Sequence, residues 1–137
     1  MNDYFHIELQ TDEISAISSI GLAHLGDAVY ELLVRTYLCT KGKATGRGLH
    51  RATIALVCAT AQAERLEKIM PLLTEEEIAV VRRGRNAQVR TIPQHASRKV
   101  YSEATALEAL LGYLYLHGQQ TRINALFVTM MAEPAAE

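Results

Sequence analysis

A chain of 137 residues with 49% hydrophobic residues has the size of one compact domain and can bury a core of its own. Its two cysteines, Cys39 and Cys58, stand apart without a second thiol or a suitably spaced histidine, so neither a disulfide framework nor a zinc site is indicated. The absence of a signal-peptide pattern and of a bilayer-spanning apolar stretch favours a cytoplasmic protein with no membrane contact.

The apolar spacing is helical from about Ile14 onward, and because two-residue alternation is nowhere sustained, the predicted fold is all-α. The first helix is expected to run to about Cys39, where the segment KGKATGRG with its three glycines ends it. A second helix is predicted over residues 49–69, closed by Pro71. The residues expected to face the core from these two helices are Leu22, Leu25, Val29, Leu32, Leu33, Ile54, Val57, Ala61 and Leu66.

The second half of the chain is also predicted to be helical. Thr74 and Glu77 form a capping box, in which each side chain satisfies an unpaired amide at a helix start, and this third helix ends in the segment RRGRN. Residues 91–98 are expected to be irregular, because Pro93 disfavours helix at the residue before it. Two further helices are predicted over 101–117 and 120–131. The expected organisation is an N-terminal extension (1–13), a single domain (14–132) and a C-terminal tail (133–137).

The formal net charge of -1 hides a clustered distribution of basic residues. No acidic residue occurs between Glu31 and Glu64 or between Glu77 and Glu103, and these two stretches hold five and six of the 14 Lys and Arg residues. Because local charge decides the attraction of a polyanion, a nucleic-acid partner is compatible with this sequence. The alternative is a solvated face with scattered counter-ions.

Two acidic residues stand inside otherwise apolar helices. Asp27 lies in GLAHLGDAVYELL, off the apolar stripe of the first helix, and Glu108 lies in ATALEALLGYLYL. Burying a carboxylate is costly unless it is paired or bound to a metal ion. Two such acids on packed helices can converge on Mg²⁺, which prefers carboxylate and water oxygens. The alternative is that each acid is a half-buried partner of an arginine.

These segments resemble a known family. LGDAVYE followed by LEALLGYLYLHG is similar to the two signature segments of the ribonuclease III endonuclease domain, and GDAVYE, RRGRNA and YxxAT...EALxGYLY resemble its Mini-III branch in particular. The resemblance spans roughly residues 20–117. It implies the all-α ribonuclease III endonuclease fold, a homodimer, and a catalytic domain without the appended double-stranded-RNA-binding domain.

The resemblance also implies roles for particular residues. Larger ribonuclease III enzymes carry two further acids, at the positions of Ala23 and Thr105, so only Asp27 and Glu108 are carried over as Mg²⁺ ligands and catalytic residues. The phenylalanine that enters the partner subunit in those enzymes aligns with His24, so His24 and its neighbour Ala23 are expected at the dimer interface. A general-base role for His24 is the alternative.

Glu31 shares the Asp27 strip of the first helix, which leaves two interpretations. It can form an ion pair with Arg35 one turn later or with an arginine of RRGRN, or it can serve as a further metal ligand, directly or through water.

Arginine binds phosphate bidentately, and the segment RRGRN holds three arginines in four residues, with Gly84 expected to allow a sharp turn at the helix end. We therefore expect this part of the chain to contact the RNA backbone, and capping of a helix C-terminus is the alternative. The candidate RNA-binding residues are Arg82, Arg83, Arg85, Asn86, Gln88 and Arg90, with Arg47, His50 and Arg51 as a weaker second group.

The sequence thus predicts a cytoplasmic protein, and its two carboxylates predict a Mg²⁺-dependent phosphodiesterase that leaves 5′-phosphates. The resemblance implies that it is a homodimeric endonuclease that cleaves both strands of double-stranded RNA and leaves short 3′ overhangs. Resemblance to Mini-III implies precursor 23S ribosomal RNA as the substrate. The alternatives are a non-catalytic protein of the same fold that binds double-stranded RNA or the ribosome, and a helical protein-protein adaptor.

Overall fold

The computed structural model describes residues 3–41, 46–87 and 97–133. These residues form helices and no strand, which confirms the predicted all-α fold. The helices are α1 (Thr11–Ser15), α2 (Ser19–Thr40), α3 (Gly46–Val57), α4 (Ala59–Ile69), α5 (Glu75–Arg85), α6 (Arg98–Leu116) and α7 (Gln120–Met131), with a 3-10 turn at Met70–Leu72 between α4 and α5.

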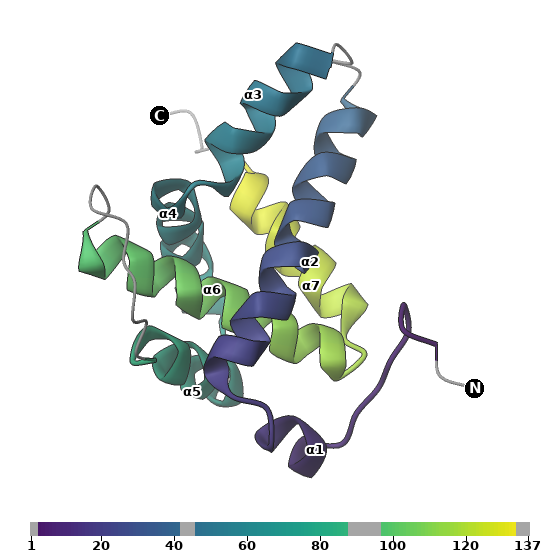
Figure 1. Cartoon of the computed structure of the whole chain (residues 1–137), viewed down its shortest axis with the longest axis vertical. Coiled ribbons are helices and arrows are strands. Elements are labelled where there is room, and N and C mark those ends of the chain that lie inside the picture. Colours follow the sequence, from purple (N-terminus) through teal and green to yellow (C-terminus); the bar gives the residue numbers. More distant parts are fainter. Residues whose placement is uncertain (1–2, 42–45, 88–96, 134–137) are drawn as a thin grey trace.

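Helix α6 forms the centre of the fold, with α2 crossing it and α4, α5 and α7 packed around it (Figure 1). Apart from Thr105 and Glu108, its sequence from residue 104 to 116 is apolar, and a helix of that kind is stable only when neighbours cover its faces. The residues of α6 that are buried are Ala104, Thr105, Ala106, Leu107, Ala109, Leu110, Leu111, Gly112, Leu114 and Leu116.

The crossing of α2 and α6 depends on two glycines. A Cβ atom on Gly26 would lie 2.5 Å from the carbonyl carbon of Glu108 and closer still to its oxygen, and a Cβ on Gly112 would lie 2.9 Å from the carbonyl carbon of Leu22. Any side chain at either position would therefore overlap the backbone of the other helix. The two glycines let the backbones of α2 and α6 come into direct contact, one residue before Asp27 and four residues after Glu108.

Two of the predicted helices are each interrupted by an extended residue. The first predicted helix is two helices in the structure, because α1 ends at Ser15 and α2 begins at Ser19. Ser18 between them is extended, and its side chain accepts a hydrogen bond from the amide of Gly21 at 3.0 Å. The second is divided at Cys58, whose φ of -65° and ψ of 157° are extended. The division allows α3 to pack on α2 while α4 packs on α6.

Some predictions about the inner faces were wrong. Leu32 is 55% exposed and Ile54 is 52% exposed, because the faces of α2 and α3 that carry them have no neighbouring helix in the described chain. Gly84 lies within α5 and makes no turn. A Cβ there would lie 3.0 Å from the Cα of Ala106 and from the Cβ of Ala109, so this glycine allows α5 to approach α6 closely.

The ends of α5 and α7 follow the predictions closely. The capping box of Thr74 and Glu77 is confirmed, with amide contacts of 3.1 and 2.9 Å, and α7 has the predicted bounds. Glu77 is also buried against Arg122 of α7, whose guanidinium donates to both of its carboxylate oxygens at 2.7 and 2.9 Å. Within the described ranges, no helix is long and apolar enough to cross a membrane.

Candidate active site

Asp27 of α2 and Glu108 of α6 converge beside the glycine crossing. Asp27 is exposed and Glu108 is half-buried, and their carboxyl groups are close enough to share a hydrogen bond. Burial, together with the hydrogen bond and the charge of the adjacent Asp27 carboxyl, raises the pKa of Glu108 to about 8. Two carboxylates in contact repel each other unless a proton or a cation lies between them, so this pair is suited to bind a positive ion.

Sequence reasoning missed Gln62 of α4, which also contacts this pair. Its side chain is 3% exposed, and its Nε2 donates to Glu108 Oε2 at 3.5 Å and to the carbonyl oxygen of Val57 at 2.9 Å. Gln62 lies one turn before the buried Leu66 on the inner face of α4. A polar residue on an apolar stripe was the signal in the sequence that could have identified it.

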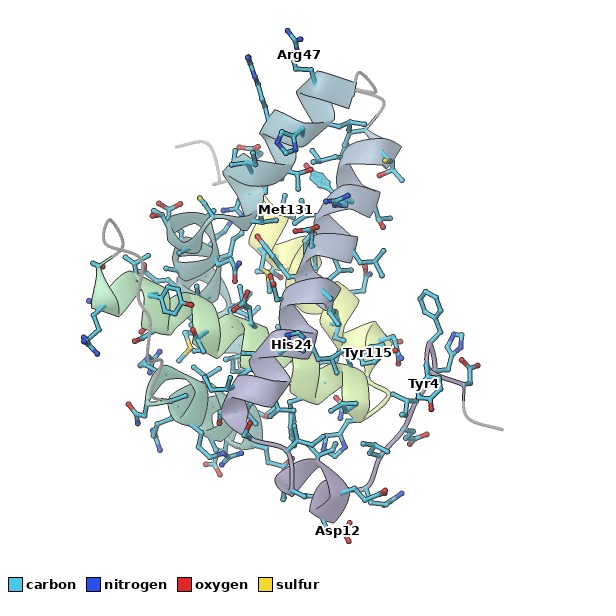
Figure 2. All side chains as sticks on the ribbon, in the orientation of Figure 1. Tyr4, Asp12, His24, Arg47, Tyr115 and Met131 are labelled. Atoms are coloured by element: carbon cyan, nitrogen blue, oxygen red, sulfur yellow. The ribbon has the colours of Figure 1, made fainter. Side chains whose placement is uncertain are left out.

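The exposed side of α2 is hollowed next to Asp27. The hollow has a volume of about 510 Å³ and is lined by His24, Asp27, Ala28, Glu31, Leu32 and Arg35. His24 lies in the second turn of α2, toward the N-terminal end of the helix (Figure 2). The expected ion pair of Glu31 with Arg35 is present at 2.8 Å, so the structure provides Glu31 with a partner that is not a metal ion.

The two positions at which larger ribonuclease III enzymes carry acids lie in the interior. Ala23 is 7% exposed and packs with Ile14, Leu22 and Val80, so its side chain belongs to the core of the subunit. Thr105 is also buried, and its hydroxyl donates to the carbonyl oxygen of Tyr101 at 3.0 Å. In the described part of the chain, no group of three or more acidic, histidine or cysteine side chains assembles into a metal site.

The arginines of α5 differ in their surroundings. Arg82 and Arg83 are exposed, whereas Arg85 donates to both carboxylate oxygens of Glu103 on α6, at 2.6 and 3.1 Å. Asn86 is the exposed C-terminal cap of α5. The predicted contacts at Gln88 and Arg90 lie outside the described residues.

The second basic group is on α3, far from the first. Arg47, His50 and Arg51 are all exposed, and Arg47 extends into solvent at the end of the molecule (Figure 2). α3 and α5 lie at opposite ends of the structure, with α2 between them (Figure 1). The fold therefore separates the two predicted basic groups and places them on either side of the helix that carries Asp27.

The donor set at the crossing fits a hard divalent cation. It consists of two carboxylates, and its neighbour Gln62 has an Oε1 atom that is buried and makes no hydrogen bond within the described chain. Mg²⁺ is commonly held by one or two carboxylates with water completing its coordination, and the Asp27–Glu108 pair has the number and type of donors that this requires.

Comparison with known proteins assigns this chain to a family. The chain matches the Ribonuclease III domain over residues 21–119. It is 50% identical to the Mini-ribonuclease 3 of Symbiobacterium thermophilum over 105 residues, which are 77% of this chain and 81% of that protein. It is 49% identical to the Mini-ribonuclease 3 of Brevibacillus brevis over 113 residues, which are 82% of this chain and 84% of that protein.

A solved structure is similar over most of its length. The crystal structure of a Fusobacterium nucleatum protein aligns with a TM-score of 0.77 at 33% identity, covering 83% of this chain and 93% of that one. The helical fold with acids on two crossing helices is thus that of a ribonuclease III endonuclease domain. The chain belongs to the Mini-ribonuclease III branch of the ribonuclease III family and is an endoribonuclease. Enzymes of this family generally use a divalent metal ion.

Proposed function

We propose that this endoribonuclease cleaves double-stranded RNA in a Mg²⁺-dependent reaction at Asp27 and Glu108. The observation that carries the proposal is the contact between these two carboxyl groups, one half-buried and one exposed, on helices joined by a glycine crossing. Because Asp27 is open to solvent, a phosphate of a large duplex can approach the pair from outside.

Asp27 and Glu108 would hold the cation from two helices whose backbones are in direct contact. A bound Mg²⁺ would activate water and neutralise charge on the phosphate. The burial of Glu108 keeps its carboxyl group out of bulk water, which strengthens its attraction for a cation. The product would keep a 5′-phosphate, because the bond that breaks is the one between phosphorus and the 3′ oxygen.

The RNA backbone would lie along the face that carries the free arginines. Arg82 and Arg83 have no acidic partner in the described chain and can meet phosphates, whereas Arg85 is already paired with Glu103. We therefore assign the stronger contacts to Arg82 and Arg83, and we keep Asn86, Gln88 and Arg90, which follow them in the sequence, as further candidates. The α3 group of Arg47, His50 and Arg51 would contact the duplex on the other side of Asp27.

We further propose that the active form is a homodimer formed through the exposed face of α2. His24 lies on this face with two apolar residues that are open to solvent, Ile20 at 44% and Leu32 at 55% exposure. Exposed apolar side chains grouped on one helix are a common mark of an interface. A two-fold axis at this face would present one carboxylate pair to each RNA strand, and the two cuts would leave 3′ overhangs.

We propose precursor 23S ribosomal RNA, the substrate that the resemblance to Mini-III implies, as the substrate to be tested first. The test is cleavage of a defined duplex RNA, with and without Mg²⁺, by the wild-type protein and by the Asp27→Asn and Glu108→Gln variants. We expect each variant to lose activity by orders of magnitude and to melt like the wild type, because the amides preserve shape but lose the charge that attracts the cation.

Matched controls make the same chemical changes elsewhere. Asp12→Asn on α1 and Glu67→Gln on α4 alter exposed acids away from the crossing, and we expect both to cleave normally. Near-wild-type cleavage by Asp27→Asn or Glu108→Gln would rule out the proposed site. Binding of duplex RNA by the wild-type protein without any cleavage would favour the non-catalytic alternative.

A further inference from the structure

Gln62 links the start of α4 to the proposed metal site. It lies in the first turn of α4, and its amide nitrogen donates to the carbonyl oxygen of Val57, the last residue of α3, at 2.9 Å. The same nitrogen donates to Glu108 Oε2 at 3.5 Å, a long hydrogen bond. The side chain is 3% exposed, so its position is determined by the protein around it and not by solvent.

The contact with Val57 determines which way the amide faces. A carbonyl oxygen only accepts hydrogen bonds, so the group 2.9 Å from it must be the Nε2 donor and not Oε1. The second hydrogen of the same NH₂ group is then available to Glu108. Oε1 is left buried without a hydrogen bond in the described chain, an arrangement that costs about 1–3 kcal/mol.

An apolar side chain of similar length would avoid this cost but would also lose the hydrogen bond to the Val57 carbonyl. The two effects on stability oppose each other, so stability alone does not explain why a glutamine stands here. The surroundings of Glu108 supply a reason. Within the described chain its carboxyl group has two side-chain partners, and the other one, Asp27, is itself a carboxyl group. Gln62 is therefore the amide donor that holds one oxygen of Glu108 while the other remains available.

We propose that Gln62 is a positioning residue that orients the Glu108 carboxylate toward the divalent cation. This inference rests on the proposed function, because it assumes that Glu108 is a ligand. Residues that hydrogen-bond a metal ligand fix its orientation, and their loss typically lowers metal affinity or activity by about 10–100-fold. The hydrogen bond to Val57 holds the amide in place, and Oε1 remains available to a water molecule of the site.

The test is Gln62→Met, which keeps the length of the side chain and removes both amide atoms. We expect Mg²⁺ binding to the free protein, measured by calorimetry, to weaken by about 10–100-fold. We expect the Mg²⁺ concentration for half-maximal cleavage to rise in parallel, with little change in KM for RNA. The melting temperature without metal should change little, because the removal of the unpaired Oε1 and the loss of the hydrogen bond to Val57 have opposite effects on stability. A purely structural residue would instead change the melting temperature and leave Mg²⁺ affinity unaltered.

The control is Gln119→Met, the same change at an exposed position before α7, which should leave all of these quantities unchanged. Should Gln62→Met fail to fold, Gln62→Asn keeps the amide on a side chain too short to reach both partners, and we expect it to weaken Mg²⁺ binding as well. Wild-type Mg²⁺ affinity in a folded Gln62 variant overturns the positioning role alone. Failure of the wild-type protein to bind Mg²⁺ would overturn the proposed function, and the inference with it.

Discussion

Replacing Gly26 with alanine tests whether the glycine crossing creates the site. The added methyl group would lie 2.5 Å from the carbonyl carbon of Glu108 and 2.9 Å from the amide nitrogen of Gly112, both backbone atoms that cannot rotate away. Ordinary contact for a Cβ atom begins at 3.4 Å. The helices α2 and α6 must therefore move apart by about 1 Å or more, which loosens packing along the central helix.

Two opposing effects determine how much Gly26→Ala changes the free energy of unfolding. Alanine favours a helix over glycine by about 1 kcal/mol, which stabilises the variant. Overpacking of a well-packed core typically costs about 1–3 kcal/mol, and a clash with backbone lies at or beyond the upper end. We therefore expect a net loss of at least about 2 kcal/mol, which lowers the melting temperature of a domain of this size by roughly 6 °C or more.

The cleavage rate of Gly26→Ala should fall by more than its loss of stability alone would cause. Separation of α2 and α6 moves Glu108 away from Asp27 by a similar distance, and a misplacement of about 1 Å in an active site can cost 100-fold in rate. The assays are thermal melting and duplex cleavage at a temperature where the variant is fully folded.

Two other glycines give a graded control. A Cβ on Gly84 meets atoms at 3.0 Å, so Gly84→Ala should be destabilised less than Gly26→Ala, and a Cβ on Gly46 meets nothing within 4 Å, so Gly46→Ala should melt like the wild type. If Gly26→Ala melts within about 1 °C of Gly46→Ala and cleaves RNA at the wild-type rate, the crossing does not position the carboxylates as described.

The remaining predictions concern an ion pair, the RNA contacts and the dimer. Arg122 lowers the pKa of Glu77, so their pairing stabilises the fold at neutral pH, and this stabilisation is lost as the pH falls below 4.5. Arg122→Met should lower the free energy of unfolding at pH 7 by about 3 kcal/mol in urea melts. A loss of the same size in acid would contradict this. Arg82→Glu with Arg83→Glu should weaken duplex binding and reduce the slope of log affinity against log salt by about 0.9 per lost contact, whereas an unchanged slope would mean that these arginines face away from RNA. His24→Glu should dissociate the proposed dimer, because it places two like charges near an apolar interface. Sedimentation should show a wild-type mass near twice 15.2 kDa. A wild-type monomer that cuts both strands would refute the dimeric mechanism.

Features set by neighbouring residues were predictable from the sequence. The Thr74–Glu77 capping box and the bounds of α7 depend on contacts within one helix, and the structure confirms both. Asp27 and Glu108 could be identified because a carboxylate in an apolar helix is costly without a partner, which makes it conspicuous in the sequence alone.

Features set by packing between distant segments were not predictable. The division at Cys58 allows α3 and α4 to pack on different helices, and no local signal marks it. Arg85 was expected to bind RNA with its two neighbours, yet it pairs with Glu103, 18 residues away.

The sequence by itself determined that the chain is helical and which two carboxylates are unusual, because apolar periodicity and the cost of buried charge are local properties. Only the tertiary structure decided that these carboxylates meet, that Gly26 and Gly112 are the reason, and that Gln62 contacts Glu108. Each of these depends on the approach of two backbones from separate parts of the chain, and such an approach follows from the packing of the whole core.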